Sequence, residues 1–217
     1  MPSTWMQTFT GVRFTPLEPQ VEDIDIRDIA HSLAYQCRYA GHTRKFLSIA
    51  EHCWHLSHLV SDKNKLIALL HDATEAYVAD VPRPLKPFLP NYYEIEDKVY
   101  EAIAERYGLP VLIPDEVHEA DTRILLDERN QFMTKSPSPI GDGWPDHMEP
   151  FGITIHGWPP SQAEDMFLRR FEELVKERCP YCGALEWEYV PVNSHYETTC
   201  CKNVGASCCE GPVSALP

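Results

Sequence analysis

Histidines and carboxylates recur in this chain at spacings that suit a metal centre. His52 falls inside one apolar helical pattern, and the adjacent His71 and Asp72 fall inside a second. Asp121 follows in a third pattern. Two imidazoles and two carboxylates form a mixed nitrogen and oxygen donor set, which suits Zn, Mn or Co, while Mg is also compatible. The sequence therefore predicts a divalent metal site whose ligands come from separate helices.

Glu75 stands where a side chain could move a proton beside that metal. It lies four residues after His71 and three after Asp72, so a continuous helix would place all three on one face. Neighbouring acids raise the pKa of such a carboxylate toward neutrality. Glu75 is therefore the expected general base for an attacking water, with Asp72 as the adjoining catalytic residue.

A second group of residues suits a phosphate. Residues 38–45 contain three cations and no acid, and Lys86 could add to this island of positive potential. Arginine offers phosphate a planar fork of donors, although some of these cations could equally belong to a solvated surface. Tyr39 and His42 lie in the same stretch, where an aromatic ring could stack on a base or sugar. Asp80 could accept a hydrogen bond from a sugar hydroxyl.

Composition and charge exclude several classes of protein. The chain has 217 residues, 43% hydrophobic and 24% charged, which excludes disordered and collagen-like proteins. A formal charge of −14 disfavours general binding to nucleic acid or anionic membranes. No apolar run reaches the roughly 18–20 residues of a membrane span, and residues 1–10 do not resemble a signal peptide. We therefore expect a cytoplasmic protein without membrane contact.

Apolar spacing near the helical period predicts a mainly α-helical domain over residues 1–178. Ser48 followed by Glu51 matches a capping box. Weak alternation predicts a strand or hairpin within residues 5–14 and a strand at residues 153–155. The expected helices cover residues 27–38, 46–61, 63–78, 92–107, 114–133 and 160–178.

Residues 179–217 form a second region, which holds six of the eight cysteines. Its CxxC knuckle is of zinc-ribbon type, and a reducing compartment favours metal binding over disulfides in such a cluster. A structural zinc would supply the stability that this short extension lacks. Without zinc, the segment would be an unfolded tail whose cysteines bind no metal. The expected zinc ligands are Cys179, Cys182, Cys201 and Cys208, with Cys200, Cys209 and His195 as alternative ligands.

The order of the metal-site residues resembles the signature of a known family. A histidine, then an adjacent histidine and aspartate, then a later aspartate form the H…HD…D pattern of the HD-domain metal-dependent phosphohydrolases. Residues 28–43, 71–76 and 80–86 are similar to the 5′-deoxynucleotidase-like branch, including phage- and prophage-encoded members. The resemblance covers about residues 5–178 and implies an HD-domain helical bundle with a short β element.

The resemblance also implies a role for each matching residue. Its metal ligands would be His52, His71, Asp72 and Asp121. Glu75 would be the catalytic acid and base, and Arg38 and Lys86 would hold the phosphate. Asp80 would hold the 3′-hydroxyl of deoxyribose, which leaves little room for a ribose 2′-hydroxyl. Tyr39 replaces a frequent tryptophan of relatives, so sugar or base selection could differ.

The resemblance implies hydrolysis of deoxynucleotide phosphate esters, with the chain acting as a 5′-deoxynucleotidase on dNMPs. A similar phage branch uses the same ligand set to remove triphosphate from deoxynucleotides, dATP in particular, and the motifs do not separate the two. A nucleotide alarmone or a cyclic nucleotide could instead be the substrate, or the chain could be a non-catalytic binding module that uses the cysteine-rich tail. Relatives commonly form homo-oligomers, and a phage-encoded member would act in the host cytoplasm.

Overall fold

The structure is a computed structural model, which describes residues 4–135, 144–176, 188–192 and 195–199. The chain divides into two compact units, Met1–Arg170 and Phe171–Pro217. The described residues are mainly helical, as the sequence predicts, with two small two-stranded sheets. No helix among them combines the length and the apolar character that crossing a membrane requires.

The second unit contributes one antiparallel hairpin, formed by β3 (Glu188–Val192) and β4 (His195–Thr199). This hairpin lies in sequence between the second and third predicted zinc ligands. All four of those ligands, Cys179, Cys182, Cys201 and Cys208, lie outside the described residues. The structural zinc and the domain boundary after residue 178 therefore stay predictions.

The first unit begins with an antiparallel pair, β1 (Met6–Gln7) and β2 (Arg13–Phe14), which confirms the predicted hairpin. Helix α1 (Ile26–Tyr35) follows, and its N-terminus is capped by the Asp25 carboxylate, which accepts from the Arg27 amide. The buried side of α1 packs against α2 (Ile49–Leu56). Helix α2 is shorter than the predicted range 46–61 at both ends: it begins after Ser48, whose side chain accepts from the Glu51 amide at 3.0 Å, and it ends at Leu56.

The predicted continuous helix over residues 63–78 is wrong in one respect, because it is broken at the metal-site residues. Helix α3 (Lys65–Leu70) ends before His71, and helix α4 begins at Glu75 and runs to Val78. Between α3 and α4, the Ala73 amide donates to the Leu70 carbonyl and the Glu75 amide donates to the Asp72 carbonyl. Each of these bonds spans three residues, so the turn is tighter than an α-helix. Such tightened turns are frequent at functional sites.

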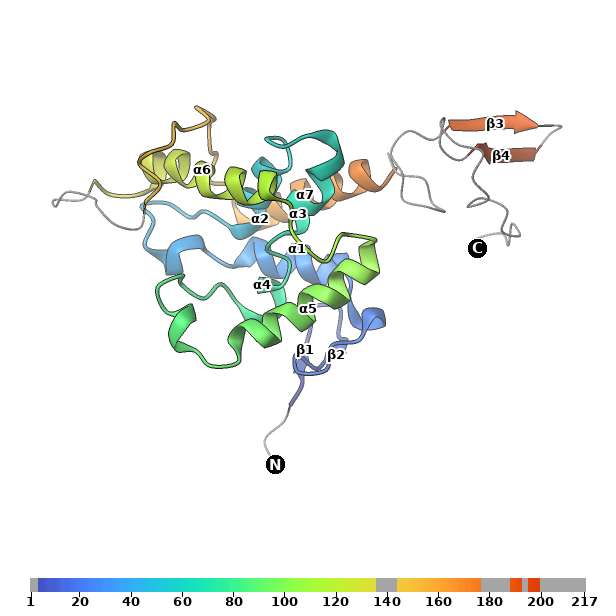
Figure 1. Ribbon diagram of the computed structural model, residues 1–217, viewed down its shortest axis with the longest axis horizontal. Helices are drawn as coiled ribbons and strands as arrows, with labels where there is room; N and C mark the ends of the chain where they lie inside the picture. The colour runs from blue at the N-terminus through green and yellow to red at the C-terminus, as the bar shows by residue number, and fades with distance from the viewer. Residues whose placement is uncertain (1–3, 136–143, 177–187, 193–194, 200–217) are drawn as a thin grey trace. The chain divides into compact units, whose positions relative to one another are not determined.

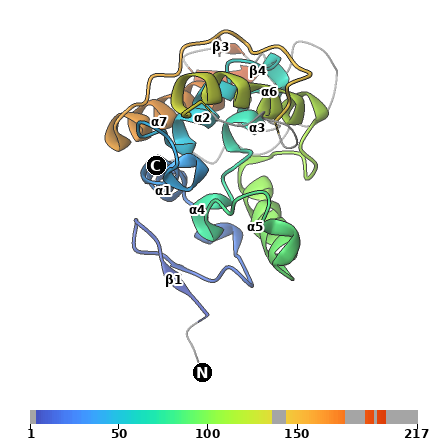
Figure 2. The same ribbon diagram turned by 90° about the vertical axis from the view of Figure 1, so that its left-hand side faces the viewer.

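The longer helices match their predicted ranges closely. They are α5 (Tyr92–Tyr107), α6 (Asp115–Phe132) and α7 (Pro160–Lys176). Within the first unit, α1 and α3 lie between α6 and α5 (Figures 1 and 2). Helix α2 packs against both α3 and α6, so the helices that carry the predicted metal ligands are neighbours.

Residues 151–158, called the strap below, run over the first unit without forming a strand, so the predicted strand at residues 153–155 is wrong. No neighbouring strand pairs with the strap in the described chain, and side chains satisfy its backbone instead. Its first three amides donate to the Asp127 carboxylate at 2.7–3.0 Å. Its last three amides donate to the Glu51 carboxylate at 2.7–2.9 Å. Glu51 thus anchors the strap rather than completing the capping box.

Candidate metal centre

The four predicted metal ligands meet at one point of the first unit. His52 comes from α2, while His71 and Asp72 occupy the tight turn after α3, and ligand atoms of these three lie within 4.8 Å of one another. Asp121 comes from α6, and its Oδ1 lies 3.1 Å from His52 Nε2 and 3.8 Å from His71 Nε2. The His52, His71 and Asp72 group could therefore hold a metal ion, with Asp121 beside it.

The carboxylates around the two imidazoles make this point attractive to positive charge. Burial disfavours the cationic form of His71, yet Asp72 together with the other neighbouring groups outweighs burial and raises the His71 pKa. Burial and Arg38 oppose the cationic form of His52, yet Glu128 and Asp121 together outweigh them and raise the His52 pKa. Burial would raise the pKa of Asp72, but His71 lowers it to about 2. A divalent cation could take the place of the imidazole protons, so the donor set fits a metal.

Glu75 lies at the start of α4, in surroundings that disfavour the ionised form of its carboxyl group. The residue is only 8% exposed, and its Oε2 has no hydrogen-bond partner in the described part of the chain. Burial, followed by the charges of Asp72 and Asp80, raises the pKa of Glu75 to about 9. An unpartnered carboxylate beside metal-ligating groups can exchange a proton with a water molecule at the site.

A cavity of about 1010 Å³ opens onto these groups. It is lined by Glu75, by three of the metal-site residues and by all the residues predicted to bind substrate. Those substrate-binding candidates are Arg38, Tyr39, His42, Asp80 and Lys86. The cavity is also lined by apolar side chains, which are Val111, Leu112, Ile113, Leu125 and Met133. The cavity thus offers charged groups for a phosphate and apolar surface for a base.

Among the cations of residues 38–45, Arg38 lies closest to the metal-site carboxylates. Its guanidinium is buried, with Nε 3.2 Å from Glu128 Oε2 and Nη1 3.6 Å from Asp72 Oδ2. Burial opposes its charge, but Glu128 together with Tyr39 and the metal-site carboxylates outweighs burial and raises the Arg38 pKa. Arg44 of the same stretch instead donates to the carbonyl of Gln131 at 2.8 Å and does not line the cavity.

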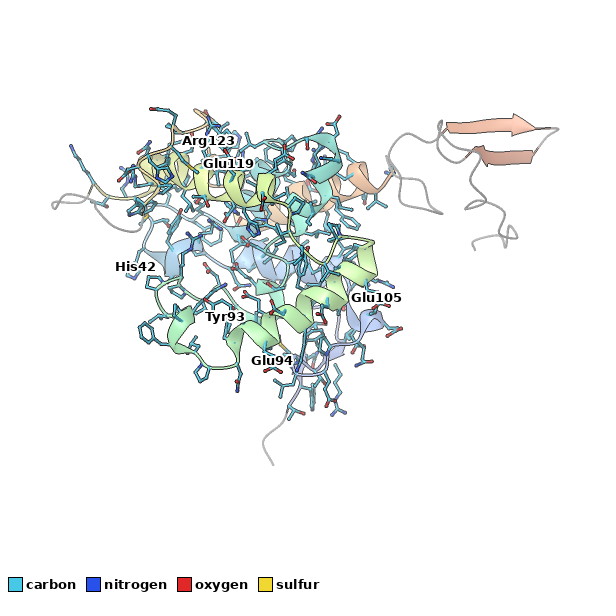
Figure 3. The ribbon with its side chains drawn as sticks, viewed as in Figure 1. His42, Tyr93, Glu94, Glu105, Glu119 and Arg123 are labelled. Atoms are coloured by element: carbon cyan, nitrogen blue, oxygen red, sulfur yellow. The ribbon has the colours of Figure 1, made fainter. Side chains whose placement is uncertain are left out.

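The other polar candidates occupy different parts of the cavity wall. Lys86 Nζ lies 2.9 Å from Glu96 Oε1 and 5.3 Å from the centre of the Tyr92 ring. Part of its charge is therefore balanced within the protein. Burial raises the pKa of Asp80. His42 is exposed at the edge of the unit (Figure 3).

The sequence reasoning missed two charged residues at this site. Glu128 of α6 is fully buried, and its carboxylate accepts hydrogen bonds from His52 Nδ1 and the Tyr39 hydroxyl, at 2.8 and 2.6 Å. Its position seven residues after Asp121, two turns along one helix, was a signal that could have found it. Arg83 is exposed, and its Nη2 lies 3.9 Å from Asp121 Oδ2.

A mainly helical fold that gathers imidazoles and carboxylates beside a cavity defines a protein with a candidate metal centre. No protein-family profile matches the chain. The uncharacterized protein YfdR of Escherichia coli K12 is 39% identical over 177 residues, which cover 81% of this chain and 98% of YfdR. An uncharacterized protein of Rhodobacter capsulatus is 31% identical over 192 residues, covering 81% of this chain and 98% of its own. The chain therefore belongs to the family that includes YfdR.

Proposed function

We propose that this protein is an HD-type, metal-dependent phosphohydrolase that acts on deoxynucleotides, primarily as a 5′-deoxynucleotidase on dNMPs. One observation carries the proposal. His52, His71 and Asp72 place ligand atoms within 4.8 Å of one another beside a cavity of about 1010 Å³. The same cavity is lined by Glu75, whose buried Oε2 has no partner in the described chain. A structural cluster would have no use for such a carboxylate.

The residues of the cavity divide the hydrolysis between them. A divalent metal, with Zn, Mn or Co as the best match to the donor set, would lower the pKa of water and offset phosphoryl charge. Beside a bound cation, Glu75 would have a lower pKa and an ionised carboxylate. Glu75 then takes the proton of the attacking water and returns it to the leaving 5′-oxygen as the phosphorus–oxygen bond breaks. Arg38 binds the phosphoryl oxygens, and Lys86, which lines the same cavity, adds positive charge.

Asp80 is proposed to select deoxyribose by accepting a hydrogen bond from the 3′-hydroxyl. We expect Asp80→Ala to narrow the preference for deoxynucleotides over ribonucleotides by about tenfold, because losing the contact leaves the sugar less firmly placed. The measurement is kcat/KM for dNMP and NMP pairs that share a base. An unchanged ratio would remove Asp80 from sugar selection without affecting the rest of the proposal.

A dNTP triphosphohydrolase, which would release tripolyphosphate and a deoxynucleoside, is the second candidate. The volume of about 1010 Å³ lies at the upper end for small-molecule sites. Arg83 adds a further cation beside Asp121, in a position to meet additional phosphate charge. A triphosphate needs more room and more positive charge than a monophosphate, so these two observations favour it.

Product analysis tests both candidates. Purified protein is incubated with each dNMP, dNTP and ribonucleotide in the presence of Mn, Co, Zn or Mg. Orthophosphate from dNMPs alone supports the nucleotidase, and tripolyphosphate from a dNTP supports the second candidate. The matched variants are His71→Ala, which removes a metal ligand, and Glu119→Gln, which changes an exposed residue on the outer side of α6 (Figure 3). Product that does not depend on His71 contradicts the proposal.

A further inference from the structure

Glu128 is a buried carboxylate that touches both the metal centre and the substrate side of the cavity. Its Oε1 accepts from His52 Nδ1 at 2.8 Å. Its Oε2 accepts from the Tyr39 hydroxyl at 2.6 Å and from Arg38 Nε at 3.2 Å. The side chain is fully buried, so these contacts are shielded from solvent. One charged group therefore joins a metal ligand to two residues that are proposed to contact substrate.

The contact with His52 determines which ring nitrogen is free to bind a metal. A neutral imidazole carries one N–H and one lone pair, and a carboxylate at Nδ1 holds the proton there. The lone pair is then on Nε2, the atom that lies 3.3 Å from His71 Nε2 and 3.1 Å from Asp121 Oδ1. Outer partners of this kind typically change metal affinity by 10–100-fold when they are removed.

The contacts with Arg38 and Tyr39 hold a strained stretch of backbone. Tyr39 and Ala40 have φ values of 56° and 49°, in the left-handed region that non-glycine residues rarely occupy. Such strain persists only where the surrounding structure imposes it. This segment runs from Arg38 to Gly41, and the side chains of its first two residues each donate a hydrogen bond to Glu128. The carboxylate thereby fixes the direction in which Arg38 and Tyr39 enter the cavity.

We propose that Glu128 is a positioning residue that couples the metal centre to the substrate-binding segment Arg38–Gly41, by fixing the His52 tautomer and anchoring that segment at once. The inference rests on the metal-dependent function proposed above and adds the link between its two halves. Asp127, the preceding residue of α6, is 3% exposed, and its carboxylate contacts only strap amides among the described residues. It therefore provides a control for loss of a buried acid on the same helix.

The test measures Co²⁺ affinity by calorimetry on the full chain and its variants. We expect Glu128→Ala to weaken Co²⁺ binding by about 10–100-fold, and Glu128→Gln to weaken it less because an amide oxygen can still accept from Nδ1. Asp127→Asn is expected to lower the melting temperature yet keep Co²⁺ affinity within about twofold of wild type, since it leaves the ligands untouched. If wild type and Glu128→Ala bind Co²⁺ with equal affinity, the proposed coupling is wrong while the proposed function still stands. A wild type that binds no divalent metal would overturn the proposed function together with the coupling.

Two readouts that do not use metal separate positioning from loss of fold. Nitrogen-15 NMR of the histidine rings, recorded at an alkaline pH where the ring is neutral, reports the His52 tautomer. We expect the Nδ1–H form to lose dominance in Glu128→Ala but not in Asp127→Asn. Hydrogen exchange across residues 38–42 should accelerate in Glu128→Ala and, to a smaller extent, in Tyr39→Phe, which removes one bond to Glu128. An unchanged tautomer together with unchanged exchange would overturn the proposal.

Discussion

Two regions of the first unit bury carboxylates in opposite ways. Under the strap, Glu51 and Asp127 each accept three backbone amides. In the cavity, Glu75 has an unpartnered oxygen and faces the charges of Asp72 and Asp80. Burial would raise the Glu51 pKa, but the His55 ring 3.6 Å away and the hydrogen bonds from the strap amides lower it. Burial and like charge instead raise the Glu75 pKa to about 9.

The difference teaches that burial of an acid does not by itself indicate function. A carboxylate with a full set of donors stabilises the fold, and removing it leaves backbone groups without partners. A carboxylate that faces other acids costs stability, and carboxylates of this kind are concentrated at functional sites. The two groups should therefore respond to the same substitution with opposite changes in stability.

The largest effect is expected from removing a metal ligand in the cavity. We expect His71→Ala to lower phosphate release by about 10⁴-fold or more, because activation of water and neutralisation of phosphoryl charge are both lost. Chelation of wild type should produce the same loss, and added Mn or Co should reverse it. Activity that survives chelation would place the reaction away from this site.

Glu75→Gln should separate activity from stability. We expect kcat to fall by about 10²–10⁴-fold, since the substitution removes the proton acceptor. The folded pKa of about 9 exceeds the ordinary value of 4.5, so the folded protein keeps a proton that the unfolded chain releases, and stability falls as pH rises through this window. Metal-free Glu75→Gln should therefore melt at least about 2 °C above wild type at pH 8, with a smaller difference at pH 5. A lower melting temperature at pH 8 would contradict this account of Glu75.

The affinity of the cavity for metal should increase with pH. The carboxylates raise the pKa values of His52 and His71 above 6.5, and both imidazoles must lose their protons before they bind a metal. Affinity should rise by about tenfold per pH unit for each proton released, from pH 6.5 up to the raised pKa values. Calorimetry in buffers of different ionisation enthalpy counts the protons directly. Binding without proton release would show that the imidazoles are already neutral.

Glu51→Gln is expected to have the smallest effect of these variants. It should lower the stability of the fold, whereas Glu75→Gln should raise it. The loss for Glu51→Gln should be about 1–3 kcal/mol, because the strap amides keep a weaker acceptor. The lowered Glu51 pKa means that wild-type Glu51 stabilises the protein above pH 4.5, so the penalty should shrink as pH falls below that value. Thermal unfolding at pH 4 and pH 7 measures both changes. A stabilised Glu51→Gln would remove the contrast between the two regions.

The sequence contains enough to predict the helices, which depend on local apolar spacing, and the metal-site group, which depends on the types and order of its donor residues. Helix α5 matches its predicted range, and His52, His71 and Asp72 meet as the donor pattern requires. Contacts between distant residues were not predictable in this way. The bond from His52 to Glu128 spans 76 residues, and its register depends on how α2 packs against α6.

The two errors in the predicted elements have related causes. Apolar spacing continues through His71 and Asp72, yet the hydrogen bonds tighten there, and periodicity does not distinguish the two patterns. Residues 153–155 alternate like a strand, but no strand of the described chain offers them a partner. The acceptors for this segment are side chains of other elements, which alternation alone does not reveal.

Gly157 gives the strap an evolutionary constraint that differs from those of the site. Its φ is 70°, and a β-carbon at this position would lie 3.0 Å from Phe132 Cε1 and 3.1 Å from the carbonyl oxygen of Phe46. Any side chain would clash with backbone and with an aromatic ring, besides the cost of the left-handed backbone. A side chain here would require Phe132 or the Phe46 carbonyl to shift by a few tenths of an ångström, in addition to the left-handed backbone. We therefore expect descendants that keep this path of the strap to favour glycine at position 157, whatever chemistry they acquire.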